Sequence, residues 1–226
     1  MPLPPPAPRQ LRHQRAIRAV AYEREDGLWD IDACLTDHKS RDVPLASGVR
    51  PNGLPIHELW LRITIDRKLN VVDAHASSDW VPYDGQCQNA NPAYRALIGL
   101  NLLQNFRREA GRLLAGTAGC THLTEMLGVL PTAAIQAFVG AVWDSSNGSP
   151  GEASGPEFGK TADGEQPPFQ LGRCHALRFD GEAVKQFYPR WYGHVPRSKE
   201  RGADVASVRE DLGPGREGKA DAVAHE

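Results

Sequence analysis

The most constraining feature of the sequence is a period-two alternation of apolar and polar residues between positions 57 and 76. Apolar residues at every second position from 59 to 65 alternate with Trp60, Arg62 and Thr64. This pattern is typical of a β-strand with one buried face. Residues 66–68 have the composition of a turn, and residues 69–76 return as a second strand. The segment therefore predicts an antiparallel β-hairpin.

A third strand is expected at residues 27–36, where Trp29, Ile31, Ala33 and Leu35 alternate with polar positions. Helical spacing of apolar residues follows from Asn91, again from Thr121, and in a third piece after Pro131. We therefore expect an α+β fold, in which a small antiparallel sheet of about three strands is packed with helices on one face.

Changes of composition along the chain predict its domain organisation. Residues 1–15 are proline-rich and should form a disordered N-terminal arm. Residues 16–192 are expected to form one domain, with a flexible insertion at 145–168 that is nearly empty of large apolar side chains. Residues 193–226 should be a disordered C-terminal tail.

The charge and hydropathy of the chain argue against two classes of partner. A net charge of −2 and a pI near 6.4 provide no overall field for nucleic acid. Glycines and polar residues interrupt the most apolar stretch, residues 126–143, so a buried helix is expected there rather than a membrane span. The N-terminus lacks the apolar region of a secretory signal, which favours a cytoplasmic protein with reduced thiols.

Four residues at the ends of the expected elements are the candidates for chemistry: His57, Cys87, Cys120 and His122. Antiparallel pairing should bring His57, at the entry of one hairpin strand, to the same sheet edge as Cys87, which follows the partner strand. Cys120 and His122 lie at the start of an expected helix, where unpaired N–H groups favour a thiolate. We expect these four side chains to converge at one edge of the sheet.

Thiolate and imidazole ligands favour zinc or an iron–sulfur centre over magnesium or calcium. The main hypothesis is therefore a metal-binding protein, in which Glu125 could orient the imidazole of His122. Cys174 and His175 could supply a further ligand, although a buried cysteine is the simpler interpretation. Asp30, Asp32, Asp37 and His38 could form a separate site for a hard metal, but a polar strand face followed by a turn explains them as well.

Two other classes of function remain open at this point. The chain could be a thiol-dependent enzyme acting on a small acyl-type substrate, with Cys120 as nucleophile and His122 or His57 as base. It could also be an interaction module with inert cysteines and no active site. The substrate, the physiological partner and the oligomeric state do not follow from the sequence.

Three segments carry a resemblance to a known family: D-G-L-W-D-I-D-A-C-L-T-D-H-K, P-I-H-E-L-W-L-R-I-T-I-D and G-C-T-H-L-T-E. Together they resemble the bacterial family of proteins of unknown function DUF2889, over roughly residues 15 to 192. That family implies no defined activity.

The order of hairpin, cysteine, helix and second cysteine also resembles the iron–sulfur cluster scaffold proteins. This second resemblance implies that Cys87 matches the second scaffold cysteine and that Cys120 matches the third. Pro55 stands where the scaffold has its first cysteine, and His57 stands where the scaffold has an aspartate. The resemblance implies a scaffold-like fold and a metal site at its sheet edge.

Overall fold

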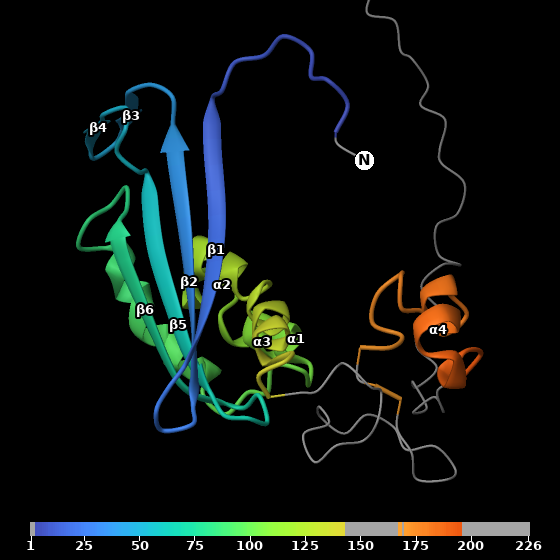
Figure 1. Ribbon diagram of the computed structural model, residues 1–226. Helices are drawn as coiled ribbons and strands as arrows, with labels where there is room; N and C mark the ends of the chain where they lie inside the picture. Colours follow the sequence, from blue (N-terminus) through green and yellow to red (C-terminus); the bar gives the residue numbers. More distant parts are fainter. Residues whose placement is uncertain (1–2, 143–166, 169, 196–226) are drawn as a thin grey trace, which may run out of the picture. The chain divides into compact units, whose positions relative to one another are not determined.

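A four-stranded antiparallel sheet forms the centre of the fold in a computed structural model of the protein (Figure 1). Its strands are β1 (His13–Glu23), β2 (Trp29–Lys39), β5 (His57–Ile65) and β6 (Val71–Trp80), in the order β1-β2-β5-β6. Between β2 and β5, the short strands β3 (Val43–Leu45) and β4 (Gly48–Arg50) form a separate two-stranded ribbon.

The structure describes residues 3–142, 167–168 and 170–195. It has two compact units, Met1–Pro156 and Glu157–Glu226, and each is treated by itself. The expected flexible insertion and C-terminal tail lie outside the described residues, apart from positions 167–168 and 193–195. The expectation of a single domain over residues 16–192 stays a prediction.

The hairpin expected at residues 57–76 is present as the antiparallel pair of β5 and β6, in which Leu61 lies opposite Ala76. The expectation of about three strands was wrong, because β1 adds a fourth that pairs with β2 along its whole length. Its first three residues had been assigned to a disordered arm. Residues 3–12 form neither helix nor strand.

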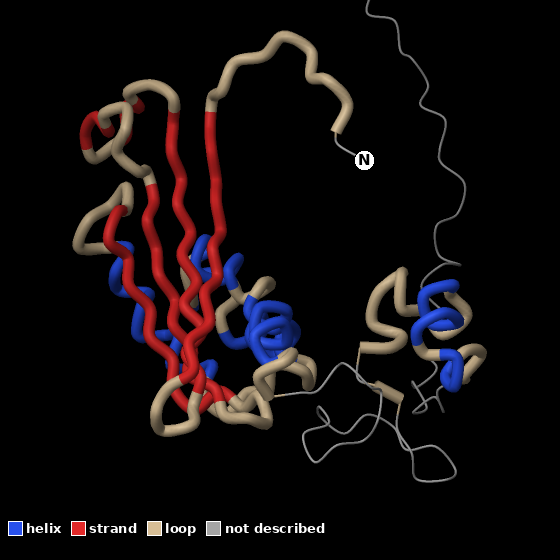
Figure 2. The backbone as a smooth tube through the Cα atoms, in the orientation of Figure 1, coloured by secondary structure: helices blue, strands red, loops and turns tan. Residues whose placement is uncertain are grey.

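The alternation in β2 and β5 divides the sheet into two different faces. Apolar side chains on one face are almost completely buried, and these are Trp29, Ile31, Ala33 and Leu35 on β2 with Leu59, Leu61, Ile63 and Ile65 on β5. The helices of the first unit cover this face (Figures 1 and 2). The other face carries polar and charged side chains such as Asp32 and Arg62. Burial of the apolar face provides the main driving force for folding.

Within the described residues of the first unit, five helical segments follow β6: η1 (Cys87–Leu97), α1 (Phe106–Leu113), η2 (Gly116–Ala118), α2 (Thr121–Met126) and α3 (Leu130–Phe138). The helix expected from Asn91 instead begins at Cys87 as a 3-10 helix and ends at Leu97. It cannot continue because the next residues bond to the start of β6, where Gly99 donates to Val71 and Val71 donates to Leu100. The break expected near Pro131 is present, with that proline in the first turn of α3.

In the second unit, α4 (Glu182–Phe187) and the short 3-10 helix η3 (Pro189–Trp191) surround a small core of Leu171, Val184 and Trp191. Cys174 and His175 are exposed on the surface of this unit. Across the described parts of both units, every helix is too short or too polar to cross a membrane.

Candidate metal site

The site is built around Asp37, which lies near the end of β2 and is only 3% exposed. Its place in the alternation puts it on the apolar face, in line with Leu35 and Ala33. A carboxylate in such a position must be paired or hydrogen-bonded, because transferring an isolated charge from water is costly. Asp37 meets this requirement through partners on both neighbouring strands.

The register of the sheet places Arg15, Asp37 and His57 in one row across three strands, with Asp37 opposite Arg15 on one side and opposite His57 on the other. The guanidinium of Arg15 binds the carboxylate as a fork, with Nε donating to Oδ1 at 2.9 Å and Nη2 donating to Oδ2 at 2.7 Å. Nε2 of His13 lies 2.8 Å from Oδ1. The carboxylate is therefore held in one orientation by β1.

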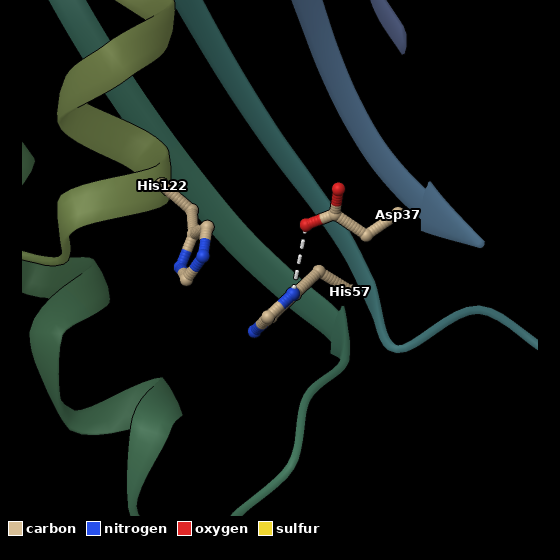
Figure 3. Close-up of side chains that lie close together, drawn as sticks. All are labelled: Asp37, His57 and His122. Carbon is tan, nitrogen blue, oxygen red and sulfur yellow. Dashed lines mark hydrogen bonds and ion pairs between the residues drawn. The ribbon is translucent and has the colours of Figure 1, made fainter. Parts of the chain in front are cut away.

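His57 is the first residue of β5, and its Nδ1 atom lies 3.0 Å from Oδ2 of Asp37. The backbone reinforces this pairing, because the N–H of Ile56 donates to the carbonyl oxygen of Asp37 at 2.8 Å. The His57 ring is half-buried, and Nδ1 faces the carboxylate (Figure 3).

His122 comes from the first turn of α2, which packs across β2 and β5. Its ring lies against that of His57, with the ring centroids 3.9 Å apart and the planes inclined by 31°. The buried Tyr94 fixes the start of this helix: its hydroxyl accepts from the N–H of Cys120 at 3.1 Å and donates to the Cys120 carbonyl oxygen at 2.8 Å. Helix α2 thereby delivers His122 to the ends of two strands (Figure 3).

The protonation states of Asp37 and His57 suit a positive ligand. Burial opposes ionisation of Asp37, but the hydrogen bonds from Arg15, His13 and His57 outweigh it and hold the pKa of that carboxyl well below its usual range. Burial lowers the pKa of His57, and the neighbouring His122 lowers it further. At neutral pH the pair is therefore a carboxylate beside a neutral imidazole, and both of these forms bind metals.

Asp37, His57 and His122 form a group in which one donor atom from each residue lies within 4.8 Å of the other two. Within the described residues it is the one group of three or more His, Cys, Asp or Glu side chains that meets this condition. A carboxylate with two imidazoles is a donor set that proteins use for zinc and for iron(II). The structure therefore contains a candidate metal site at the His57 end of the sheet.

Two of the four residues expected from the sequence, His57 and His122, thus come together. Cys120 lies beside them, with its Sγ atom 3.9 Å from Nδ1 of His122, but it does not belong to the group of three. Cys87, the first residue of η1, does not belong to it either. Cys34, which was not expected to be a ligand, is buried and lies on the opposite, polar face of β2.

From the sequence, Asp37 is expected near a turn, and neither Arg15 nor His13 is expected to take part in a site. The signal for Asp37 was present, because it continues the alternation of Ala33 and Leu35 by one more step. For Arg15 no comparable signal exists, because its role depends on pairing with a residue 22 positions away. Glu125, expected to orient His122, instead accepts a hydrogen bond from Nη1 of Arg15.

A shallow hollow of about 350 Å³ lies on the polar face of the sheet, lined in part by Trp60, Arg62 and His75. It is on the opposite side of the sheet from Asp37. Asp32, the strand partner of Arg62, is five residues from Asp37 on β2, and an odd separation along a strand places two side chains on opposite faces. Both oxygens of Asp32 already accept hydrogen bonds from Arg62, at 2.6 Å each. The hollow is therefore separate from the candidate metal site.

Comparison with known proteins identifies one family. The family of proteins of unknown function DUF2889 matches residues 13–136, a range that contains all four strands of the large sheet and the residues of the candidate site. No curated protein and no solved structure matches the chain significantly, so the resemblance to iron–sulfur cluster scaffolds finds no support there. The chain belongs to the DUF2889 family.

Proposed function

We propose that the protein binds a single divalent transition-metal ion, with zinc as the first candidate, through Asp37, His57 and His122. The observation that carries the proposal is the clustering of one donor atom from each residue within 4.8 Å. A metal ion would take the place of the proton between Nδ1 of His57 and Oδ2 of Asp37. The ring of His122 would then supply the third ligand.

The surroundings of Asp37 support this arrangement. A carboxylate has about four lone-pair positions, so Oδ1 can keep its bonds to His13 and Arg15 while Oδ2 binds a metal. In metal sites, the residues that bind the ion commonly accept or donate hydrogen bonds to neighbouring groups, and these bonds fix the orientation of the ligand. The fork from Arg15 also neutralises part of the carboxylate charge, which should moderate rather than prevent binding.

Three protein ligands leave one position of a tetrahedral ion open, as in catalytic rather than structural zinc sites. Water at that position would be acidified by the ion and could act as a nucleophile near neutral pH. An iron–sulfur cluster is a weaker candidate, because it requires thiolate ligands and neither Cys87 nor Cys120 belongs to the group. We therefore favour a mononuclear site that could activate water.

Titration of the full-length protein with Co²⁺ tests the proposal, because this ion substitutes for zinc and reports its ligands by visible absorption. We expect saturation at one ion per chain, without the intense near-ultraviolet charge-transfer band that thiolate ligands produce. The double variant Cys87→Ser, Cys120→Ser is the matched control and should give the same spectrum. Failure to bind Co²⁺ would refute the proposal, and a strong thiolate band that the double variant lacks would show that cysteines are the ligands.

A second candidate is the thiol-dependent enzyme, with Cys120 as nucleophile. Burial raises the pKa of the Cys120 thiol, but the interaction with His122 lowers it, and the net shift is downward. Asp37 could orient His57, which stacks on His122, so that an imidazole near the thiol accepts its proton. This candidate predicts that Cys120 in the metal-free protein reacts with iodoacetamide much faster than the exposed Cys174. Similar rates for the two thiols would exclude it.

A further inference from the structure

We propose that the site takes a substrate bearing a small oxyanion group, which binds the metal ion and Arg15 together in the place that Glu125 occupies on the guanidinium. This inference rests on the proposed metal site and names the chemical class of its ligand. The shared chemistry is that of a carboxylate or a phosphate, since both present two oxygens about 2.2–2.5 Å apart to a guanidinium fork.

The first observation is the incomplete use of the Arg15 guanidinium. Arginine has five N–H donors. Three of them have partners in the structure: Nε and Nη2 each donate to Asp37, and Nη1 donates to Glu125. One hydrogen on Nη1 and one on Nη2 remain for a ligand within the described part of the chain. The side chain of Arg15 is 33% exposed, so an incoming anion can reach it.

The second observation is the short path from Arg15 to the proposed metal position. Nη2 of Arg15 lies 2.7 Å from Oδ2 of Asp37, the oxygen that would bind the ion. A zinc ion with a bond of about 2.0 Å to that oxygen would therefore lie within roughly 5 Å of Nη2. Two oxygens of a single phosphate or carboxylate can span this separation, with one on the metal and one accepting the remaining hydrogen of Nη2, next to the Nη1 group that binds Glu125.

The third observation is the nature of the Glu125 contact. Asp37 and Glu125 both bind Arg15, but their side chains differ greatly in exposure, at 4% and 43% respectively. An exposed ion pair contributes little to stability, whereas a buried one is costly to break. An anion can thus displace Glu125 from Nη1 while the fork to Asp37 stays intact. Glu125 acts as an internal carboxylate that occupies part of the ligand position.

The charge of the loaded site also favours an anion. Arg15 and a divalent ion together carry three positive charges, and Asp37 and Glu125 carry two negative charges. The two imidazoles are neutral when they bind metal. An oxyanion that replaces Glu125 would supply the negative charge that Glu125 provides beside Arg15. It would also form a bond to the metal, which Glu125 does not.

The test is a titration of the Co²⁺-loaded full-length protein with inorganic phosphate and, separately, with acetate, followed by visible absorption. Chloride serves as the anion without paired oxygens. We expect a saturable spectral change with one or both oxyanions, and the stronger of the two identifies the class of the substrate group. Removal of the competing carboxylate in Glu125→Gln should tighten that oxyanion by about three- to tenfold.

Arg15→Lys provides the opposite change, because lysine keeps the charge but cannot form the fork. Its oxyanion affinity should fall by at least about tenfold. Arg18→Lys is the matched control on the same strand, since Arg18 lies opposite Cys34 on the polar face of the sheet, and it should behave as the unmodified protein. The Glu125→Gln result stands on its own if Arg15→Lys fails to fold.

Three outcomes would overturn the inference. Co²⁺ binding without any oxyanion effect would refute it and leave the proposed metal site intact. An oxyanion affinity that is the same in the unmodified protein and in Glu125→Gln would mean that the anion does not take the place of Glu125 on the guanidinium. Failure to bind Co²⁺ at all would remove the proposed function, and the inference with it.

Discussion

Nδ1 of His57 and Oδ2 of Asp37 lie 3.0 Å apart, on two residues that are direct partners across β2 and β5. Two ligands of a tetrahedral zinc ion with bonds of about 2.0–2.1 Å lie roughly 3.3 Å apart. Nδ1 and Oδ2 therefore need to move apart by only a few tenths of an ångström for a metal ion to replace the proton between them. The backbone register sets this separation, so the site is prepared by the fold of the sheet.

Replacing His122 tests whether α2 contributes a ligand. The variant His122→Ala removes one of three protein ligands and should weaken zinc binding by at least about 100-fold, as measured by competition with a chromophoric chelator. His75→Ala is the matched control, because His75 lies on the polar face and pairs with Asp73. Equal zinc affinities for the two variants would show that His122 is not a ligand.

The variant Asp37→Asn should lower the free energy of unfolding by about 3 kcal/mol, because it removes the charge of a buried carboxylate that accepts hydrogen bonds from Arg15, His13 and His57. Urea denaturation of the metal-free protein measures this effect. Asp79→Asn, at an exposed position on β6, should change the stability by less than about 0.5 kcal/mol. Our description of Asp37 as a paired, buried carboxylate would be wrong if the two variants were equally stable.

Acidification should destabilise the metal-free protein in two steps. Because the pKa of His57 is lowered on folding, the unfolded chain binds more protons below its pKa of about 6.5, so stability falls as the pH drops through that value. The pKa of Asp37 is also lowered, and its contribution is lost below about pH 4. One proton changes the stability by at most about 1.4 kcal/mol per pH unit.

Unfolding free energies at pH 7.0 and about pH 5.5 measure the first step. His57→Gln should remove most of the decrease between these two values, whereas His75→Gln should retain it. A decrease of the same size in both variants would assign the effect to other groups.

The close packing around Gly119 gives a prediction about the helix that carries His122. A Cβ atom at this position would lie 2.8 Å from the carbonyl oxygen of Leu114 and 3.2 Å from the hydroxyl of Tyr94. Gly119→Ala should therefore displace the start of α2, and weaken metal binding as well as stability. Gly111→Ala is the control, because a Cβ there meets nothing within 4 Å and removes a glycine from α1. Unchanged zinc affinity in Gly119→Ala would show that the Tyr94 contacts do not position His122.

The parts of the fold that were predictable are those with a strong local pattern. The alternation around Leu61 and Ile63 identified β5 because both residues are buried on one face of a central strand. Strand β1 was missed because it is an edge strand whose residues are all exposed or partly exposed, and the aliphatic side chains on its face toward the helices are Ile17 and the small Ala19 and Ala21. Its pairing with β2 is a tertiary effect, which the local sequence does not encode strongly.

The site was predictable only in part, for a related reason. His57 and His122 could be placed because each lies at the end of an element with a recognisable boundary. Asp37 continues the alternation of Ala33 and Leu35, but the partners that make its burial possible, Arg15 and His13, lie in a strand that had not been predicted. Cys87 and Cys120 were predicted as ligands because thiolates bind metals well, but neither belongs to the group of three donors. The chemistry of a side chain does not determine whether the fold places it near the others.

The most direct measurement is a crystal structure of the full-length protein grown with zinc, with anomalous difference maps calculated on both sides of the zinc absorption edge. We predict a single peak per chain, about 2.0–2.2 Å from one oxygen of Asp37 and from one ring nitrogen each of His57 and His122. A peak bound to the sulfur atoms of Cys87 and Cys120, or an ordered Asp37–His57 pair with no peak beside it, would contradict metal binding by Asp37, His57 and His122.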